Sequence, residues 1–245
     1  MALPGSGTLA LSDIQTEFGG SNPISISEYY GSGGAPGSGT ISISDFYGLS
    51  AGPAVPPFAS IYVADGRTTA GNLSLNSAGS TGTYLIIVYV GDNGLPSTPS
   101  GFTLLTSVTT SSCDLAVYYK IRSGSEGTVL VNSLAGSAAC LFDCNNIYEQ
   151  PTSSGTTGMP DPTTATIATS RYSFIAGGLD DDGTVTPTAP SGYTLIDYTN
   201  VNGGASASVT LMTAYNPSTG GGSTNPAAFG GGGSDNWAAV HLEVD

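Results

Sequence analysis

The only histidine of the chain, His241, is the side chain best suited to acid–base catalysis. A serine hydrolase uses such a histidine as a general base, oriented by an acid and within reach of a serine. The apolar segment Trp237–Val244 predicts a strand whose alternation places His241 and Glu243 on one face, opposite Val240 and Leu242. We expect that polar face to meet solvent. No Gly-x-Ser-x-Gly sequence precedes a predicted helix, so an exposed structural histidine is favoured over a catalytic one.

Two acidic turns could hold a cation or a pair of catalytic carboxylates. Asp92–Gly94 and Asp180–Gly183 each follow a predicted strand. Paired carboxylates perform glycoside hydrolysis, and Ca²⁺ takes about six to eight oxygen ligands, but no spaced Asp-x-Asp-x-Asp-Gly loop is present. Asp-Gly and Asn-Gly are also common turn sequences. We therefore expect turn formation, with calcium binding by residues 92–94 and 180–183 as the alternative and catalysis behind both.

The chain has an odd number of cysteines: Cys113, Cys140 and Cys144. Cys140 and Cys144 are four residues apart in an apparent strand, roughly 13 Å at about 3.3 Å per residue, which exceeds the reach of a disulfide. A structural zinc site usually needs about four nitrogen or sulfur ligands, and only one histidine is available. We expect buried, reduced thiols that pack as small apolar groups, with no metal and no other cofactor.

The charge balance excludes several partner classes. The chain of 245 residues has a formal net charge of −14 and only four basic side chains. Four scattered cations cannot form the basic stripe that nucleic acids require, and they do not favour an anionic membrane surface. The longest apolar run, Tyr84–Val90, is too short to cross a bilayer, and the N-terminus lacks the basic start and apolar stretch of a secretory signal.

One short phrase occurs three times within residues 1–50. Its copies share a small residue, Leu or Ile, Ser, an acid and then an apolar residue, and they stand at Ala10–Ile14, Ile24–Gly31 and Ile41–Gly48. Pro-Gly-Ser-Gly-Thr introduces the first and third copies, at Pro4–Thr8 and Pro36–Thr40. A repeat of this length is too short to bury a core of its own, so we expect residues 1–50 to form an adhesive anchoring arm.

Local signals predict the structure of this arm. Ser12 and Gln15 have capping-box spacing and predict a short helix that ends near Phe18. Ser27 and Ser44 would each begin a helical turn, after an extended Ile-Ser-Ile-Ser segment, and Gly31 and Gly48 would end those turns. Residues 51–58 contain three prolines and are predicted to be a linker.

The body, residues 59–245, is predicted to be a series of strands. Tyr84–Val90 is apolar throughout, as expected for a central strand covered on both faces. Asp114–Arg122 alternates, and Thr128–Leu134 is predicted to return beside it as a hairpin. Val209–Tyr215 and Trp237–Val244 are further strands, separated by a long Gly-rich loop over residues 216–236.

A second repeat divides this body into two halves. Pro99–Leu105 returns as Pro190–Ile196, and each copy follows a strand that ends in one of the acidic turns. The closing strands, Ala138–Asp143 and Ala238–Glu243, also resemble each other. We therefore predict an all-β fold, in which a jelly-roll-like β-sandwich with two pseudo-repeated halves follows the N-terminal arm.

The arm resembles the N-termini of virion proteins of tailed bacteriophages, especially those of marine and cyanobacterial phages. Those proteins often open with Ser-Gly-Thr-Ile-Ser-Leu-Ser-[Asp/Gln]-Ile and Gly-Gly-Ser-Asn-Pro-Ile-Ser-Leu-Ser-Glu-Tyr-Tyr phrases, which match Ser6–Ile14 and Gly19–Tyr30. The body is similar to β-sandwich modules of the same class of proteins, at Pro99–Leu104, Leu115–Lys120 and Ser123–Glu126. Gly127 stands where these modules often have proline. The resemblance implies a virion structural protein and brings no catalytic residues.

These observations lead to one functional expectation, a non-enzymatic structural component of a phage virion that assembles in the bacterial cytoplasm. We expect it to be tail-associated (fibre, baseplate or tail tip), with a capsid decoration or head-fibre protein as the alternative and a secreted carbohydrate-active enzyme as a distant third. Its expected partners are other virion proteins, further copies of the chain in a symmetric assembly and a glycan of the host surface, but neither nucleic acid nor membrane. The candidate interface residues lie in the arm: Asp13, Phe18, Tyr29, Tyr30, Phe46 and Tyr47.

Overall fold

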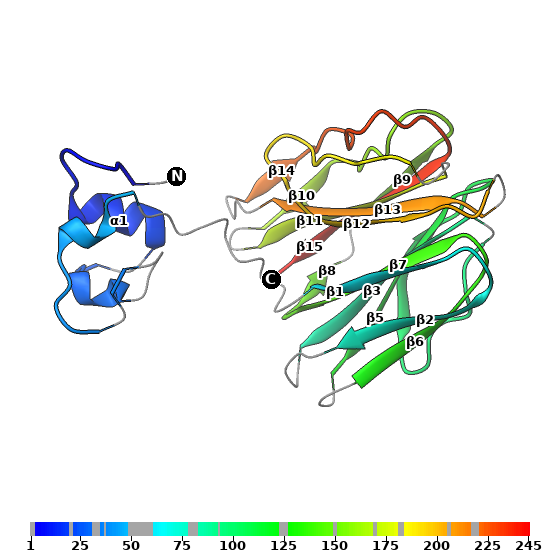
Figure 1. Ribbon diagram of the computed structural model, residues 1–245, viewed down its shortest axis with the longest axis horizontal. Helices are drawn as coiled ribbons and strands as arrows, with labels where there is room; N and C mark the ends of the chain where they lie inside the picture. Colours follow the sequence, from blue (N-terminus) through cyan, green and yellow to red (C-terminus); the bar gives the residue numbers. More distant parts are fainter. Residues whose placement is uncertain are drawn as a thin grey trace. The chain divides into compact units, whose positions relative to one another are not determined.

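A computed structural model divides the chain into two compact units, Met1–Val55 and Pro56–Asp245. We refer to them as the N-terminal unit and the body, and each is described by itself (Figure 1). The structure describes residues 3–19, 22–30, 35–36, 38–48, 61–77, 83–92, 94–122, 127–148, 151–168, 171–180, 184–204, 207–216 and 221–245. The predicted linker at residues 51–58 lies outside these residues, as do residues 123–126 between the two strands of the predicted hairpin.

The N-terminal unit consists of three short helical elements, one for each copy of the repeat. They are the helix α1 (Leu11–Phe18) and the 3-10 helices η1 (Ile26–Tyr29) and η3 (Ile43–Phe46). The predicted end of the first helix at Phe18 is confirmed, but its predicted start is wrong. Ala10 is the N-cap and Asp13 occupies the N3 position, two residues before the predicted capping pair Ser12 and Gln15.

The second and third copies show the same shift of two residues. Ser25 and Ser42 are the N-caps of η1 and η3, so the predicted helical turns at Ser27 and Ser44 begin earlier than expected. The second Ile-Ser pair of each Ile-Ser-Ile-Ser segment therefore belongs to a 3-10 helix, whereas the N-cap residues Ser25 and Ser42 have the extended backbone that was predicted. The shift has a physical reason, because the acid three residues after the N-cap bonds back to the N-cap amide.

The body is all-β throughout its described residues. Its strands are β1 (Ile61–Arg67), β2 (Gly71–Ser77), β3 (Tyr84–Gly91), β4 (Thr103–Val108), β5 (Asp114–Ile121), β6 (Gly127–Ser133), β7 (Ser137–Cys144), β8 (Ile147–Tyr148), β9 (Thr152–Gly155), β10 (Ala165–Ile167), β11 (Tyr172–Leu179), β12 (Thr194–Val201), β13 (Val209–Asn216), β14 (Gly222–Thr224) and β15 (Trp237–Val244). The strands predicted at Tyr84–Val90, Asp114–Arg122, Val209–Tyr215 and Trp237–Val244 are confirmed as β3, β5, β13 and β15.

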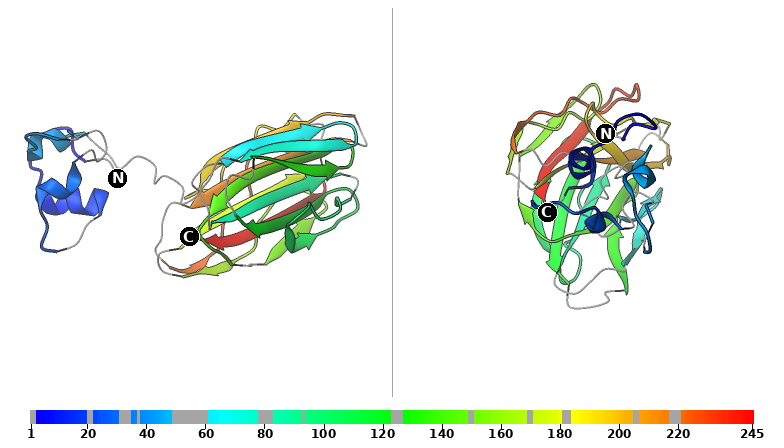
Figure 2. Two further views of the ribbon diagram at one scale, coloured as in Figure 1. Left: turned by 90° about the horizontal axis from the view of Figure 1, so that it is seen from below. Right: turned by 90° about the vertical axis from the view of Figure 1, so that its left-hand side faces the viewer.

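Two large antiparallel sheets form the sandwich. The first sheet has the order β1-β7-β3-β5-β4, and the second has the order β12-β13-β11-β15-β8, with β9 also paired to β15. Each large sheet takes its strands from one half of the body. Two small sheets, β2-β6 and β10-β14, lie outside them. Figures 1 and 2 show the large sheets stacked face to face, with β2 and β6 beyond the first sheet and β10 and β14 beyond the second.

The two large sheets contain four strands in the same relative order, β7-β3-β5-β4 and β15-β11-β13-β12. The Pro-Ser-Gly-aromatic turns before β4 and β12 are alike, with N–H···O bonds of 3.0 Å from Phe102 to Pro99 and from Tyr193 to Pro190. Both edge strands also change register two residues later, between Leu104 and Thr106 in β4 and at the matching position of β12. The jelly-roll-like plan and the division of the sandwich into two pseudo-repeated halves stay predictions.

The central core lies between the two large sheets. Alternate residues of β3, β5, β7, β11, β13 and β15 fill it, and the rings of Phe142 and Phe174 stand 4.5 Å apart across it. The first sheet packs tightly against Gly178 of β11, where an added Cβ would lie 2.3 Å from a methyl carbon of Val90 and 3.1 Å from the sulfur of Cys113. Glycine is therefore the residue that fits this position.

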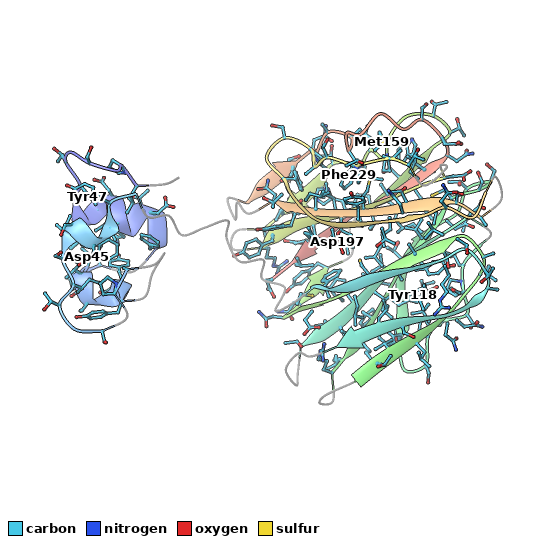
Figure 3. All side chains as sticks on the ribbon, in the orientation of Figure 1. Asp45, Tyr47, Tyr118, Met159, Asp197 and Phe229 are labelled. Atoms are coloured by element: carbon cyan, nitrogen blue, oxygen red, sulfur yellow. The ribbon has the colours of Figure 1, made fainter. Side chains whose placement is uncertain are left out.

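The outer face of the first sheet is covered by β2 and β6. Leu73 and Leu75 of β2 pack there with Val129 and Val131 of β6, above buried residues that include Tyr118 (Figure 3). This layer explains why the central strand β3 is apolar on both faces. The predicted hairpin between Asp114–Arg122 and Thr128–Leu134 is wrong, because β6 pairs with β2 along its whole length and not with β5. The apolar residues of β6 are buried against the first sheet in this position.

The outer face of the second sheet is covered by connecting segments. Val185, Phe229 and the partly buried Met159 pack there against Ile175 and Met212 (Figure 3). The predicted loop over residues 216–236 is only partly a loop, because β14 pairs with β10 and Gly230 forms a bridge with Thr188. These pairings hold the covering segments in place, so both faces of the second sheet are buried.

Candidate functional site

The three repeats of the N-terminal unit bury a shared core. The residue at the fourth helical position of each copy, Ile14, Tyr29 or Phe46, is buried. Phe18 completes an aromatic cluster, with ring centroids 6.1 to 6.3 Å from those of Tyr29 and Phe46. The expectation that these repeats cannot bury a core of their own is therefore wrong. Each copy alone is too short, but three copies together enclose an apolar cluster that also contains Leu3, Leu9 and Ala35.

An acid supports the start of each helical element in the same way. The carboxylates of Asp13, Glu28 and Asp45 accept hydrogen bonds of 2.8, 3.2 and 2.8 Å from the amides of Ala10, Ser25 and Ser42. Negative charge near a helix N-terminus is also favourable electrostatically. The acid of the repeated phrase is thus a capping residue. Asp13, which was predicted to be an interface residue, has this capping role.

The copies are joined to one another in a closed cycle. The residue after the buried one bonds to the loop that leads into the next copy: Gln15 Nε2 donates to Asn22 Oδ1 at 3.5 Å, and the Tyr30 hydroxyl donates to the carbonyl of Gly39. The third copy returns to the first, because the Tyr47 hydroxyl donates to the carbonyl of Gly7 at 2.5 Å.

Further contacts and backbone conformations support this cycle. The amide of Gly48 donates to the carbonyl of Pro4 at 3.0 Å, beside the Tyr47 contact. Gly7 and Gly39 occupy the same place in the two Pro-Gly-Ser-Gly-Thr loops, with φ of 99° and 91°. Glycine adopts this backbone conformation without a steric penalty. The repeated loop sequence therefore matches a repeated structural role.

The predicted interface residues have different environments in this unit. Phe46 is 0 % exposed and Tyr29 only 3 %, so both side chains pack inside the core of this unit. Tyr30 is 38 % exposed, while Phe18 and Tyr47 are intermediate. Asp13 and Tyr30 are thus exposed, and Phe18 and Tyr47 are partly accessible. The contact of these residues with a partner stays a prediction.

The body contains a serine–histidine pair that the sequence did not reveal. His241 is fully buried, so the prediction that it faces solvent is wrong. Its Nε2 lies 2.6 Å from the hydroxyl of Ser173, and that hydroxyl lies 2.6 Å from the hydroxyl of Tyr193. Its Nδ1 lies 2.8 Å from the carbonyl of Thr163. The predicted orientation relative to Val240 is confirmed, but this outer face of the second sheet is covered by connecting segments.

The geometry of this network defines its protonation. A carbonyl can only accept, so Nδ1 carries the hydrogen, and Nε2 accepts from Ser173, which in turn accepts from Tyr193. Burial lowers the pKa of His241, and the hydrogen bond to Thr163 opposes that shift. The imidazole is neutral in this network, because its Nε2 accepts a hydrogen bond. A carbonyl stands where a hydrolase triad has a carboxylate, and Ser173 is 2 % exposed. The pair as folded is a structural network and not an accessible nucleophile.

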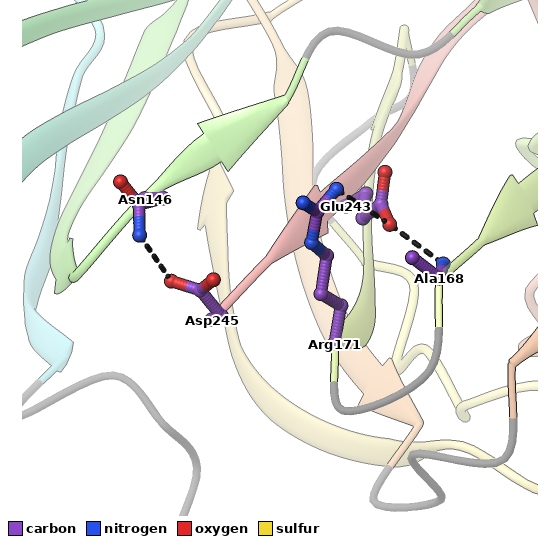
Figure 4. Close-up of polar contacts among 5 residues, drawn as sticks. All are labelled: Asn146, Ala168, Arg171, Glu243 and Asp245. Atoms are coloured by element: carbon purple, nitrogen blue, oxygen red, sulfur yellow. Dashed lines mark hydrogen bonds and ion pairs between the residues drawn. The ribbon is translucent and has the colours of Figure 1, made fainter.

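A cluster of charged and polar side chains lies further along β15, next to its C-terminal end (Figure 4). Glu243, also predicted to face solvent, is buried; one oxygen accepts from the amide of Ala168 at 2.6 Å and lies 3.1 Å from Arg171. The guanidinium of Arg171 also lies 3.6 Å from the ring centroid of Tyr148. Next to it, Asn146 donates to the carboxylate of Asp245 at 2.8 Å. These contacts attach the segments that contain Asn146, Ala168 and Arg171 to the C-terminal end of the chain, at Glu243 of β15 and Asp245.

Beneath the β2-β6 layer lies a fully buried ion pair. Arg122 Nη2 and Asp143 Oδ1 are 2.6 Å apart, and both side chains are 0 % exposed. Burial raises the pKa of Asp143, and the bond to Arg122 opposes that rise. The sequence did not reveal this pair, because Arg122, which follows β5, and Asp143 of β7 are 21 residues apart.

The cysteines agree with prediction. Cys113, Cys140 and Cys144 are all free and buried. Burial raises the pKa of the Cys140 thiol to about 12 and also raises the pKa values of the other two. Thiols with such pKa values are protonated and pack as apolar groups.

The acidic turns are only partly described, because residues 93 and 181–183 lie outside the described ranges. Asp92 is 9 % exposed, and its amide donates to the carbonyl of Gly136 at 2.9 Å. Asp180 is intermediate in exposure and bonds through its amide to Asn236. Across the described ranges, no three His, Cys, Asp or Glu side chains are grouped as a metal site. Calcium binding stays a prediction.

Comparison with known proteins identifies no relative. No family model, no curated protein and no solved structure matches the chain. Within the described residues, no helix is both long and apolar enough to span a membrane.

Proposed function

We propose that this chain is a structural, non-enzymatic component of a bacteriophage particle, associated with the tail as part of a fibre, baseplate or tail tip. The N-terminal unit anchors the chain, and the sandwich is displayed. The observation that carries the proposal is that the phrases resembling phage virion proteins coincide with a separate compact unit, whose three copies close on one another.

The nature of this unit changes how anchoring would occur. An arm without a core would fold only on its partner, whereas a unit with its own core docks as a preformed surface. This surface has four carboxylates, of Asp13, Glu17, Glu28 and Asp45, and residues 1–55 contain no Lys or Arg. A neutral or basic surface of another virion protein complements that charge.

The body supports display better than catalysis. Its Ser173–His241 pair is sealed beneath connecting segments, and the central strands β3 and β11 of the two large sheets are buried on both faces. Such a rigid double-faced sandwich suits a component that must persist outside a cell. Copies of one chain in a particle are expected to be related by symmetry.

Deletion of residues 1–50 in the phage that encodes the chain tests the anchor. Purified particles should then lack the protein, whereas a Tyr198→Phe control, altered at an exposed side chain of the body, should be incorporated normally. Conversely, residues 1–58 fused to a fluorescent protein should join the particle.

The outcomes separate the parts of the proposal. Normal incorporation of the truncated chain would overturn the anchoring role, and absence of the intact protein from particles would overturn the virion role. Electron microscopy of labelled particles gives the position: density on the tail supports the proposal, and density on the capsid favours the decoration or head-fibre alternative.

A further inference from the structure

A groove of about 500 Å³ opens on the covered side of the second sheet. One wall is formed by residues 161–163, after β9, and the other by residues 225–228, after β14. Ser153 of β9 and Trp237 of β15 line the remainder. This volume is within the range of about 300–1,000 Å³ that is typical of small-molecule sites.

The two walls are joined to each other on both sides of the groove. The amide of Phe229 donates to the carbonyl of Pro160 at 2.9 Å. The hydroxyl of Thr164 donates to Asn225 Oδ1 at 2.8 Å, next to the paired strands β10 and β14. The groove is therefore formed before any ligand enters, which lowers the entropy lost on binding.

Hydrogen bonds from two side chains fix the wall at residues 161–163. Ser153 donates to the carbonyl of Asp161 at 2.7 Å, and His241 Nδ1 donates to the carbonyl of Thr163 at 2.8 Å. The serine–histidine–tyrosine network thus has a positioning role, because it holds one wall of the groove through Thr163.

The aromatic residue of the groove is fixed too. Trp237 Nε1 donates to the carbonyl of Thr157 at 3.0 Å. A Cβ on Gly155 would lie 2.6 Å from the indole, so the ring lies directly against the backbone of β9. Trp237 is 9 % exposed, so only a small part of the side chain can line the groove.

The groove combines polar and apolar groups in a way that fits a sugar. The carboxylate of Asp161 is exposed and makes no ion pair within the described part of the chain. The side-chain oxygen of Asn225 accepts a hydrogen bond from Thr164. The N–H groups of the same amide can therefore act as donors to a ligand. The apolar lining comes from Pro162, Pro226, Ala227, Ala228 and Trp237.

The charge of the groove restricts the class of ligand. No Lys or Arg lines it, and the whole chain has a formal net charge of −14. Anionic ligands are therefore repelled. A carboxylate acceptor and an amide donor opposite apolar side chains suit a polyhydroxylated ring, with its hydroxyl groups on one side and its C–H groups on the other.

We propose that this groove binds a neutral sugar unit of a glycan. Asp161 accepts hydrogen bonds from sugar hydroxyls, Asn225 donates to a sugar oxygen, and the prolines, alanines and indole contact the C–H face. In the particle proposed above the glycan belongs to the host surface, and in that respect the inference rests on the proposed function.

The test uses the full chain on an array of neutral and anionic oligosaccharides, followed by calorimetric titration of the neutral oligosaccharide with the strongest signal. Asp161→Ala should weaken binding at least about tenfold, because it removes a charge-assisted acceptor. Ala228→Trp should abolish binding by filling the groove from an exposed position. Asn132→Ala, exposed on β6, is the matched control and should bind as the wild type does. Near-ultraviolet circular dichroism establishes that each variant is folded.

Each outcome bears on one proposal. Absence of binding to every neutral oligosaccharide, selective binding of anionic ones, or binding unchanged by both groove variants would overturn the sugar site. If the chain binds a neutral sugar in the groove but is absent from phage particles, the sugar site stands and the virion role falls. If it is present in particles but binds no sugar, the reverse holds.

Discussion

The hydroxyl of Tyr47 donates to the carbonyl of Gly7 across 40 residues of sequence. This bond connects the last copy of the repeat to the loop that precedes the first. Together with the contacts from Gln15 to Asn22 and from Tyr30 to Gly39, it makes the N-terminal unit a closed arrangement of three copies. The predictions below test this closure and three features of the sandwich.

Replacement Tyr47→Phe should destabilise the N-terminal unit by about 1 kcal/mol, the usual net contribution of one hydrogen bond. The ring of Tyr47 remains, so only the connection to Gly7 is removed. Amide hydrogen exchange of the full chain should become faster over the described residues of this unit, with no change in the body. Tyr198→Phe, at an exposed tyrosine of β12, should leave both units unchanged. Unaltered exchange in Tyr47→Phe would show that the cycle contributes nothing.

Stability should depend on the protonation of His241. Burial lowers its pKa in the folded state, so unfolding takes up a proton at pH values below about 6.5, the unfolded value. The contribution of the neutral imidazole is therefore complete above that pH and is lost as the pH falls, with a limiting slope of about 1.4 kcal/mol per pH unit.

Urea unfolding at pH 7.5 and pH 5 measures this dependence, by comparison of the wild type with His241→Asn. The comparison is needed because the buried carboxyls of Asp114 and Asp143 have raised pKa values, which favour the folded state at lower pH. Glu243 and Tyr193 face the same network and are present in both proteins. Equal pH dependence in the two proteins would contradict the expected role of His241.

Removal of one partner from the Arg122–Asp143 pair should be costly. Asp143→Leu leaves a guanidinium in an apolar layer and should lower the free energy of unfolding by about 3–5 kcal/mol. The double replacement Arg122→Met with Asp143→Leu removes both charges and should lose much less than the sum of the single changes. Chemical unfolding of the four proteins completes the cycle, and simple additivity would rule out coupling.

Replacement Gly178→Ala should destabilise the sandwich by about 1–3 kcal/mol, because the new methyl group overlaps Val90. The loss should shrink in a Val90→Ala background, where both methyl groups of that side chain are absent. Gly71→Ala is the matched strand control, since its Cβ would meet only a guanidinium nitrogen of Arg67 at 4.0 Å. Thermal unfolding measures the wild type, the Gly178→Ala and Val90→Ala variants, their combination and the Gly71→Ala control. A loss that is independent of Val90 would place the strain elsewhere.

Much of the architecture could be predicted from local patterns. The continuous apolar run of β3 indicated a strand covered on both faces, and the alternation of β15 placed His241 opposite Val240. The odd cysteine count, the spacing of Cys140 and Cys144 and the presence of only one histidine correctly indicated free, buried thiols. The repeated phrase marked where the helical elements of the N-terminal unit lie, although their starts were misplaced by two residues.

What covers each face was decided only by the tertiary structure. Alternation tells which side chains share a face, but it carries no information on the segment that packs above it. His241 was therefore expected in solvent, and it is instead sealed by Thr163 and Tyr193, which lie 78 and 48 residues away in sequence. For the same reason β6 was predicted beside β5 but pairs with β2.

In the N-terminal unit, the sequence did not show that the three copies of the repeat pack on one another. Each copy has too little apolar surface to fold alone, and that property is visible in the sequence. Whether three such copies attach to a partner or to one another depends on contacts between distant residues, such as Tyr47 and Gly7. The sequence thus determined the helices and strands and which side chains share a face. The tertiary structure decided which of those faces pack together. The physical reason is that the free energy of such packing is gained only when segments distant in sequence are brought into contact.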